Sequence, residues 1–117
     1  MSKIKRHQTS ARMSGIAIHG DTVYMAGAVA DDANADAGEQ TRQVLAKIDE
    51  RLKIAGSDRS KLLSATIWLC DMADFDAMNA AWDAWIDPAN PPCRACVLSP
   101  KLARDGWCVE IMAIAAK

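Results

Sequence analysis

The hydrophobic positions near the N-terminus fall into short β-rich runs. Residues 16–18 and 22–26 are two such runs, and His19-Gly20-Asp21 separates them. A Gly-Asp pair between two apolar runs is typical of a tight hairpin turn. The pattern therefore predicts a first β-hairpin. The polar and basic segment before it, residues 1–14, is expected to form an edge strand or an extended arm.

A longer apolar period follows a small, acidic loop over residues 27–38. From Glu39 onward the hydrophobic pattern has the spacing of one face of an α-helix. The positions on that face are Thr41, Val44, Leu45, Ile48, Leu52 and Ala55. Asp36 and Glu39 are placed to cap the start of this helix, and Gly56 is placed to end it. We expect a long amphipathic helix that lies on a sheet by its apolar stripe.

The next segment, residues 62–70, changes to a period of two, which predicts a strand. One face would carry Leu63, Ala65, Ile67 and Leu69, and the other Ser64, Thr66 and Trp68. Asp71 is placed to cap a second helix, whose stripe is Phe75, Met78, Trp82, Trp85 and Ile86. The tryptophan pair is compatible with a stacking platform, but aromatic residues at helical spacing more often belong to a core. Pro88, Pro91 and Pro92 end this helix.

Two further apolar runs near the C-terminus complete a predicted order of β-β-α-β-α-β-β. Each helix follows a strand at a distance that permits a crossover back to the sheet. This order predicts the α+β class, with a mixed β-sheet that carries two helices packed on one face. The other face would include Thr66, Trp68, Cys96 and Met112, and we expect another subunit to cover it.

Arg94 and Glu110 are charged residues within these last two apolar strands. Because alternate side chains share a face, Arg94 would lie with Cys96, and Glu110 with Cys108 and Met112. If the strands pair antiparallel, we expect the two charges to converge. They would then form either a structural ion pair or a ligand site, in which the planar guanidinium of Arg94 binds a carboxylate with two hydrogen bonds.

The composition limits the classes of function. A chain of 117 residues is predicted to form one domain, residues 1–117. A net charge of −1, with 14 dispersed Lys and Arg residues, argues against a nucleic-acid partner. The sequence has no apolar signal segment and no run of about 20 apolar residues, so we expect a cytoplasmic location and no membrane partner.

The four cysteines are expected to be reduced thiols, because the chain lacks a secretory signal. Cys93 and Cys96 have C-x-x-C spacing, but on a strand this spacing places them on opposite faces. That arrangement suits neither a zinc site nor a redox pair. With only two histidines, His7 and His19, we expect no metal site.

Several motifs occur in an order that resembles a known family. They are Ala26-Gly27, Gln40-Thr41-Arg42-Gln43, Ala65-Thr66-Ile67-Trp68-Leu69, Asp74-Phe75, Pro92-Cys93-Arg94-Ala95-Cys96-Val97 and Val109-Glu110-Ile111-Met112-Ala113-Ile114-Ala115. The ordered set covers nearly the whole chain and is similar to the RidA/YjgF family of small enamine and imine deaminases. Older labels for that family are endoribonuclease L-PSP and translation inhibitor.

The resemblance implies a single RidA-like domain with a chorismate-mutase-like fold, which forms a homotrimer with ligand sites between adjacent subunits. It implies that Arg94 holds the carboxylate of a small substrate, and that Glu110 positions the water that attacks an imine carbon. Cys96, Gly27 and Ala26 would contact the substrate. The expected reaction hydrolyses 2-imino or enamino acids of the 2-aminoacrylate type to 2-oxo acids and ammonia, with no cofactor. A small buried hydrophobic residue is the alternative role for Cys96.

Two segments depart from the family pattern. Archetypal deaminases have a tyrosine before the first hairpin and Ser-Gly-Gln at its end, where this chain has Arg12-Met13 and Ala26-Gly27-Ala28. The missing polar groups favour an alternative, a trimer that binds small carboxylates without turnover. A ribonuclease or translation inhibitor is a third reading, which the weakly basic character of the chain disfavours. The sequence specifies neither the physiological substrate nor the pathway.

Overall fold

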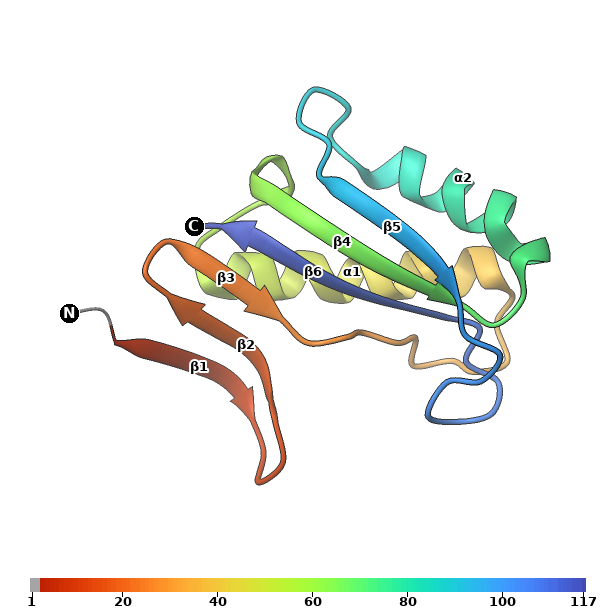
Figure 1. The fold of residues 1–117 in the computed structure, drawn as a ribbon, viewed down its shortest axis with the longest axis horizontal. Helices are drawn as coiled ribbons and strands as arrows, with labels where there is room; N and C mark the ends of the chain where they lie inside the picture. The colour runs from red at the N-terminus through yellow and green to blue at the C-terminus, as the bar shows by residue number, and fades with distance from the viewer. Residues whose placement is uncertain (1–2) are drawn as a thin grey trace.

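A six-stranded sheet forms the centre of the molecule, and both helices pack on one of its faces (Figure 1). The computed structural model describes residues 3–117. Its main elements are β1 (Ile4–Thr9), β2 (Ser14–His19), β3 (Thr22–Met25), α1 (Ala37–Ala55), β4 (Leu62–Leu69), α2 (Phe75–Trp85), β5 (Cys93–Leu98) and β6 (Val109–Ala116). The predicted α+β class is confirmed. The edge strand expected within residues 1–14 is β1, and the first two residues of that segment lie outside the described residues.

The strands follow the order β1-β2-β3-β6-β4-β5 across the sheet. β4 and β5 pair in parallel, with α2 as the crossover between them, and the other neighbours pair antiparallel. The C-terminal strand therefore lies in the middle of the sheet. Because β4 lies between β5 and β6, the antiparallel pairing that would bring Arg94 and Glu110 together is not formed.

Helix α1 forms as its sequence predicts. The side chain of Asp36 accepts a hydrogen bond from the Glu39 amide at 2.9 Å, and Gly56 ends the helix with a left-handed backbone, φ 78°. The four large aliphatic residues of its apolar stripe are at most 1 % exposed, namely Val44, Leu45, Ile48 and Leu52. Burying each such side chain contributes about 1.5–3 kcal/mol, so the stripe anchors the helix to the sheet.

The predicted faces of β4 need one correction at its start. Leu63 is 49 % exposed, whereas Leu62 is only 6 % exposed and belongs to the core. The pairing with β6 shifts register between Leu62 and Ser64, so one extra residue bulges out of β4. A bulge reverses the alternation on one side of it, and this moves Leu63 out of the core. From Ala65 onward the predicted faces hold.

Helix α2 begins through a 3-10 turn, Met72–Asp74, and the Asp71 carboxylate accepts from the Ala73 amide within that turn at 2.9 Å. Met78 and Trp82 are buried, and Trp85 and Ile86 pack partly against the same core. Phe75 is 38 % exposed, so the predicted stripe was wrong at that position. The rings of Trp82 and Trp85 lie 5.6 Å apart and are tilted, which is a core contact.

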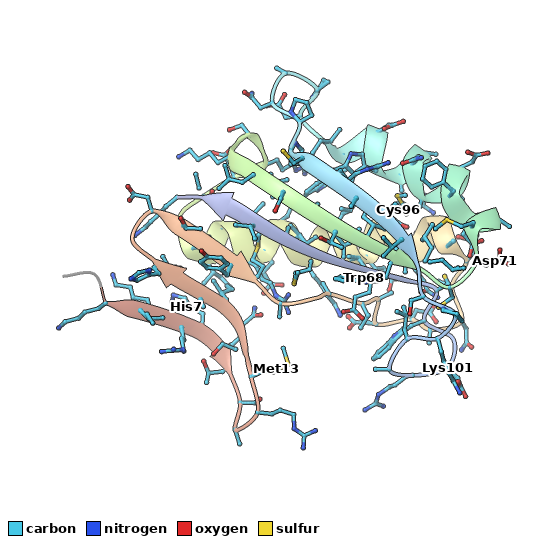
Figure 2. All side chains as sticks on the ribbon, in the orientation of Figure 1. His7, Met13, Trp68, Asp71, Cys96 and Lys101 are labelled. Carbon is cyan, nitrogen blue, oxygen red and sulfur yellow. The ribbon has the colours of Figure 1, made fainter. Side chains whose placement is uncertain are left out.

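The face of the sheet away from the helices, here called the open face, is uncovered. On β4 and β6 it consists of three cross-strand pairs, Ser64 with Ile114, Thr66 with Met112, and Trp68 with Glu110. Met112 is 38 % exposed, and Tyr24 of β3 extends the same face with 49 % exposure. Trp68 is labelled on these central strands in Figure 2. No helix in residues 3–117 combines the length and hydrophobicity needed to cross a bilayer.

Candidate functional site

Glu110 is a carboxylate on the open face without a partner in its own chain. It lies on β6 opposite Trp68, between two core positions, Val109 and Ile111, which face the helices. The Glu110 side chain is part of a half-buried residue. Within residues 3–117 it forms no ion pair and no hydrogen bond. A half-buried carboxylate with free oxygens is suited to accept a proton or a hydrogen bond from a ligand.

Gly27 lies directly against this carboxylate. A Cβ atom placed on Gly27 would come within 2.1 Å of Glu110 Oε2. The loop that carries Gly27 follows β3 and is fixed beside β6, because Ala28 and Ile111 exchange two backbone hydrogen bonds of 2.8 and 3.1 Å. The preceding amide, that of Ala26, donates to Gly15 O at 2.9 Å. No acceptor within residues 3–117 binds the Gly27 N–H, which is therefore a free donor beside a free carboxylate.

Arg94 lies on the opposite face of the sheet. Its β5 position is beside Ala65, a buried residue of β4, so the side chain points towards the helix layer. The guanidinium carbon lies 5.3 Å from the centre of the Trp82 ring, a cation–π contact worth about 0.5–1 kcal/mol at an exposed site. Arg94 is exposed and forms no hydrogen bond or ion pair within the described chain. The ion pair with Glu110 considered above does not form within one chain.

Cys96 lies on the same face as Arg94, beside Ile67, and packs partly against the core. The prediction that it contributes to the open face was wrong, because β5 pairs in parallel with β4 and brings Cys96 level with a core residue. Burial raises the pKa of the Cys96 thiol, and the nearby Arg94 opposes this shift only in part. The thiol is therefore a poor nucleophile near neutral pH. Cys93 lies on the other face beside Ser64, as the C-x-x-C spacing predicts.

The predicted site residues thus form two groups. Gly27, Ala26 and Glu110 come together on the open face, and Arg94 and Cys96 come together on the helix side of the edge strand β5. Strand β4 separates the groups. Met13, at one of the positions that departs from the family pattern, lies in the β1–β2 turn and is 52 % exposed. A single chain does not bring the two groups into one cleft.

Comparison with known proteins places this arrangement in a family. The sequence profile described as endoribonuclease L-PSP matches residues 3–117. The chain belongs to this family, also called the YjgF/RidA family. A RutC family protein from Haemophilus ducreyi is 43 % identical over 113 residues, which are 97 % of this chain and 96 % of that protein. The RutC family protein YoaB of Escherichia coli is 44 % identical and covers 97 % of each chain.

Solved structures of the YjgF/RidA family share the fold. A YjgF family member from Neisseria meningitidis is 40 % identical, with a TM-score of 0.94 over 98 % of this chain and 95 % of that chain. An uncharacterized protein from Pseudomonas aeruginosa is 41 % identical, with a TM-score of 0.94 over 98 % and 99 % of the two chains. The resemblance identified from the sequence motifs is therefore confirmed for family and fold.

Two residues that fix the Gly27 loop within this YjgF/RidA fold were not expected from the sequence. Arg51 Nη1 donates to Ala26 O at 2.8 Å, and Lys47 Nζ donates to Val29 O at 2.6 Å. Both side chains come from α1, one turn apart, and both bind backbone carbonyls of the segment 26–29. The sequence feature that could have indicated them is a pair of cationic residues four positions apart on the polar side of the helix. Their targets are not visible in the sequence.

Proposed function

We propose that this member of the YjgF/RidA family is a deaminase that hydrolyses 2-imino and enamino acids to 2-oxo acids and ammonia. The observation that carries the proposal is the unpaired Glu110 carboxylate, held on the open face against Gly27. Partial burial of a charged group in an apolar sheet face costs free energy unless a partner binds the charge. No partner in the described chain binds Glu110, which favours a ligand as its partner.

The chemistry requires one base and one water molecule. Glu110 accepts a proton from water as the water oxygen bonds to the imine carbon, which gives a tetrahedral carbinolamine. Glu110 then returns this proton to the nitrogen, and the C–N bond breaks. The hydroxyl proton of the carbinolamine moves through the same carboxylate to the released ammonia, so that water and iminium give a carbonyl and ammonium. Orientation and one proton relay suffice because imines hydrolyse readily, and the reaction needs no cofactor.

Arg94 is proposed to hold the substrate carboxylate, and it does so from a neighbouring copy of the chain. Its five N–H donors are all free within the described residues, and a planar guanidinium binds a carboxylate with two parallel hydrogen bonds. Because Arg94 and Glu110 of one chain lie on opposite sides of the sheet, a shared cleft needs Glu110 from one subunit and Arg94 from another.

The assembly proposed for this purpose is a homotrimer in which the open face of each subunit is covered by a neighbour, with the neighbour's edge strand β5 bringing Arg94 to the cleft. Trp68, Met112 and Tyr24 give that face a large apolar component, and exposed apolar patches of this kind are typical of subunit contacts. A cytoplasmic location is part of the same proposal. It is supported by Cys70, Cys93, Cys96 and Cys108, which are all free thiols.

A second candidate is a trimer that binds small carboxylates without turning them over. Ala26 and Ala28 favour it, since their methyl groups offer no hydrogen bonds where archetypal deaminases have polar side chains. We do not propose a ribonuclease, because the net charge of −1 gives little attraction for a polyanion.

Turnover of a freshly made imino acid decides between the two candidates. 2-Iminobutanoate is generated in the cuvette by an amino-acid oxidase, and release of 2-oxobutanoate is followed with wild-type protein, Glu110→Gln and no protein. The deaminase proposal predicts acceleration by wild type alone. If the three samples release 2-oxobutanoate at equal rates and the wild type still binds 2-oxobutanoate, the protein binds small carboxylates without turnover.

A further inference from the structure

Arg51 holds an unusual position beneath the Gly27 loop. Its guanidinium donates from Nη1 to Ala26 O at 2.8 Å and from Nε to the Gln8 side-chain oxygen at 3.0 Å. The residue is half-buried, and burial lowers the pKa of Arg51, while the nearby Glu50 carboxylate opposes this shift only in part. Within residues 3–117 no ion pair involves Arg51, whereas Arg59, also bound to a backbone carbonyl, pairs with Asp49. The charge of Arg51 is therefore not held in a direct ion pair, and Glu50 compensates it only from a longer distance.

The residue that accepts from Arg51 Nε, Gln8, is uncharged and has an unusual backbone conformation. Gln8 has φ 54° and is the non-glycine residue in the described chain with a positive φ, a conformation that costs about 1–2 kcal/mol for most residues. Its side chain reaches Arg51 by crossing over Gly15, where a Cβ atom would lie 2.5 Å from the Gln8 oxygen. The contact between Arg51 and its uncharged acceptor therefore depends on the strained backbone of Gln8 and on the absence of a side chain at Gly15.

The loop is held at both ends from the same helix. Arg51 binds the carbonyl of Ala26, and Lys47 binds the carbonyl of Val29 at 2.6 Å and the Asp31 carboxylate at 2.7 Å. Lys47 is thus ion-paired, and Arg51 is not. The two contacts fix the orientation of the peptide groups between residues 26 and 29.

The Ala26–Gly27 peptide links Arg51 to the candidate site. In a trans peptide the C=O and the N–H of one unit point in opposite directions. The Ala26 carbonyl points to Arg51 on the helix side, so the Gly27 N–H points away from the helices, towards the side where Glu110 lies. This N–H has no acceptor within residues 3–117. A cation bound to the carbonyl polarises the peptide and makes its N–H a stronger donor.

We propose that Arg51 is a positioning residue, which orients and polarises the Ala26–Gly27 peptide so that the Gly27 amide binds an anionic oxygen of the ligand beside Glu110. The inference rests on the deaminase function proposed above and on the contact of Gly27 with the substrate that the family resemblance implies, and it deepens them by naming the residue that orients the Gly27 amide. The positive charge of Arg51 acts through the peptide, and the neutral residue at position 8 binds the guanidinium without forming a direct ion pair.

Gln8→Glu is the discriminating variant. It retains the length of the side chain and its bond to Arg51, and it supplies a carboxylate in direct contact with the guanidinium. If Arg51 is only structural, the new ion pair leaves ligand affinity unchanged and leaves the melting temperature unchanged or raised. If the free charge of Arg51 strengthens the Gly27 amide, the melting temperature behaves in the same way, but affinity for 2-oxobutanoate falls about five- to twentyfold.

Three further variants complete the experiment. Arg51→Met removes both contacts and is expected to weaken 2-oxobutanoate binding at least about tenfold. Arg51→Lys retains the charge and is expected to recover most of that loss. Arg59→Met is the matched control, because Arg59 binds Trp85 O at 2.8 Å and Asp49, remote from the Gly27 loop, and its loss should lower the melting temperature without changing affinity.

Affinity is measured by calorimetry, and the Gly27 amide proton is followed by NMR without ligand, where Gln8→Glu should shift it upfield. If Gln8→Glu binds 2-oxobutanoate with wild-type affinity, the inference is overturned. If Arg51→Met does not fold, Gln8→Glu alone still tests the role of Arg51. Wild-type protein that binds no 2-oxobutanoate overturns the proposed function and the ligand assigned to Gly27. The amide shift then still tests Arg51 separately, since an unmoved resonance rules out polarisation of the peptide.

Discussion

Gly27→Ala gives the most direct test of the Glu110 site. The added Cβ would lie 2.1 Å from Glu110 Oε2 and 3.0 Å from the carboxyl carbon, while ordinary van der Waals contact begins at 3.4 Å. The carboxylate must therefore retreat by about 1.3 Å. Gly27 does not belong to the glycines with a positive φ, so alanine introduces no backbone strain there. Glycine at this position makes room for the Glu110 side chain.

The expected effect falls on catalysis and not on folding. A displacement of about 1 Å in a catalytic group reduces the rate about a hundredfold, so kcat/KM for 2-iminobutanoate should fall by about that factor, or about 2.7 kcal/mol. The obstructing atoms are at the end of a flexible side chain, so the free energy of unfolding should change by about 1 kcal/mol or less. Imine hydrolysis and urea denaturation on one preparation measure both quantities.

Two controls make the result interpretable. Gly38→Ala, in the first turn of α1, meets its nearest atom at 3.6 Å and should stabilise the helix slightly without affecting turnover. In a Glu110→Gln background, Gly27→Ala should add little further loss, because both changes act on the same group. A Gly27→Ala enzyme with the wild-type rate, or a loss that multiplies fully with that of Glu110→Gln, would refute the reasoning.

The other predictions concern single features of the structure. Glu110→Gln should retain affinity for 2-oxobutanoate and lose most turnover, since the amide keeps the shape but cannot accept the proton; an unchanged rate would remove Glu110 from the chemistry. Arg94→Lys should weaken 2-oxobutanoate binding about ten- to a hundredfold at nearly constant melting temperature, because the guanidinium forms no hydrogen bond within the described chain. A destabilised Arg94→Lys protein with full affinity would contradict that role. Light scattering should give the mass of a trimer, and a stable monomer would exclude a shared cleft. Gln40→Leu should lower the free energy of unfolding by about 2–4 kcal/mol in urea, because the fully buried amide accepts from the Cys108 N–H and donates to Gly106 O.

The local elements were predictable because their signals are local. The spacing from Thr41 to Ala55, with Asp36 before it and Gly56 after it, contains what is needed for α1, and the structure adds only the surface on which the helix packs. The hairpin of β2 and β3 follows in the same way from Gly20-Asp21. Alternation also placed Arg94 with Cys96 on one face of β5, and Cys93 on the other.

The tertiary structure decided which strands are neighbours, and this determined the site. Alternation shows which side chains of a strand share a face, but it does not show which face meets the helices or which strand lies alongside. The insertion of β4 between β5 and β6 therefore separated Arg94 from Glu110, and the bulge at Leu63 changed a face that alternation alone had assigned otherwise. The contact of Glu110 with Gly27 joins residues far apart in the chain, and it depends on the Ala28–Ile111 bridge. The bond from Arg51 to Ala26 O has no sequence signal of its own, since a backbone carbonyl is present at every residue and only packing selects one of them.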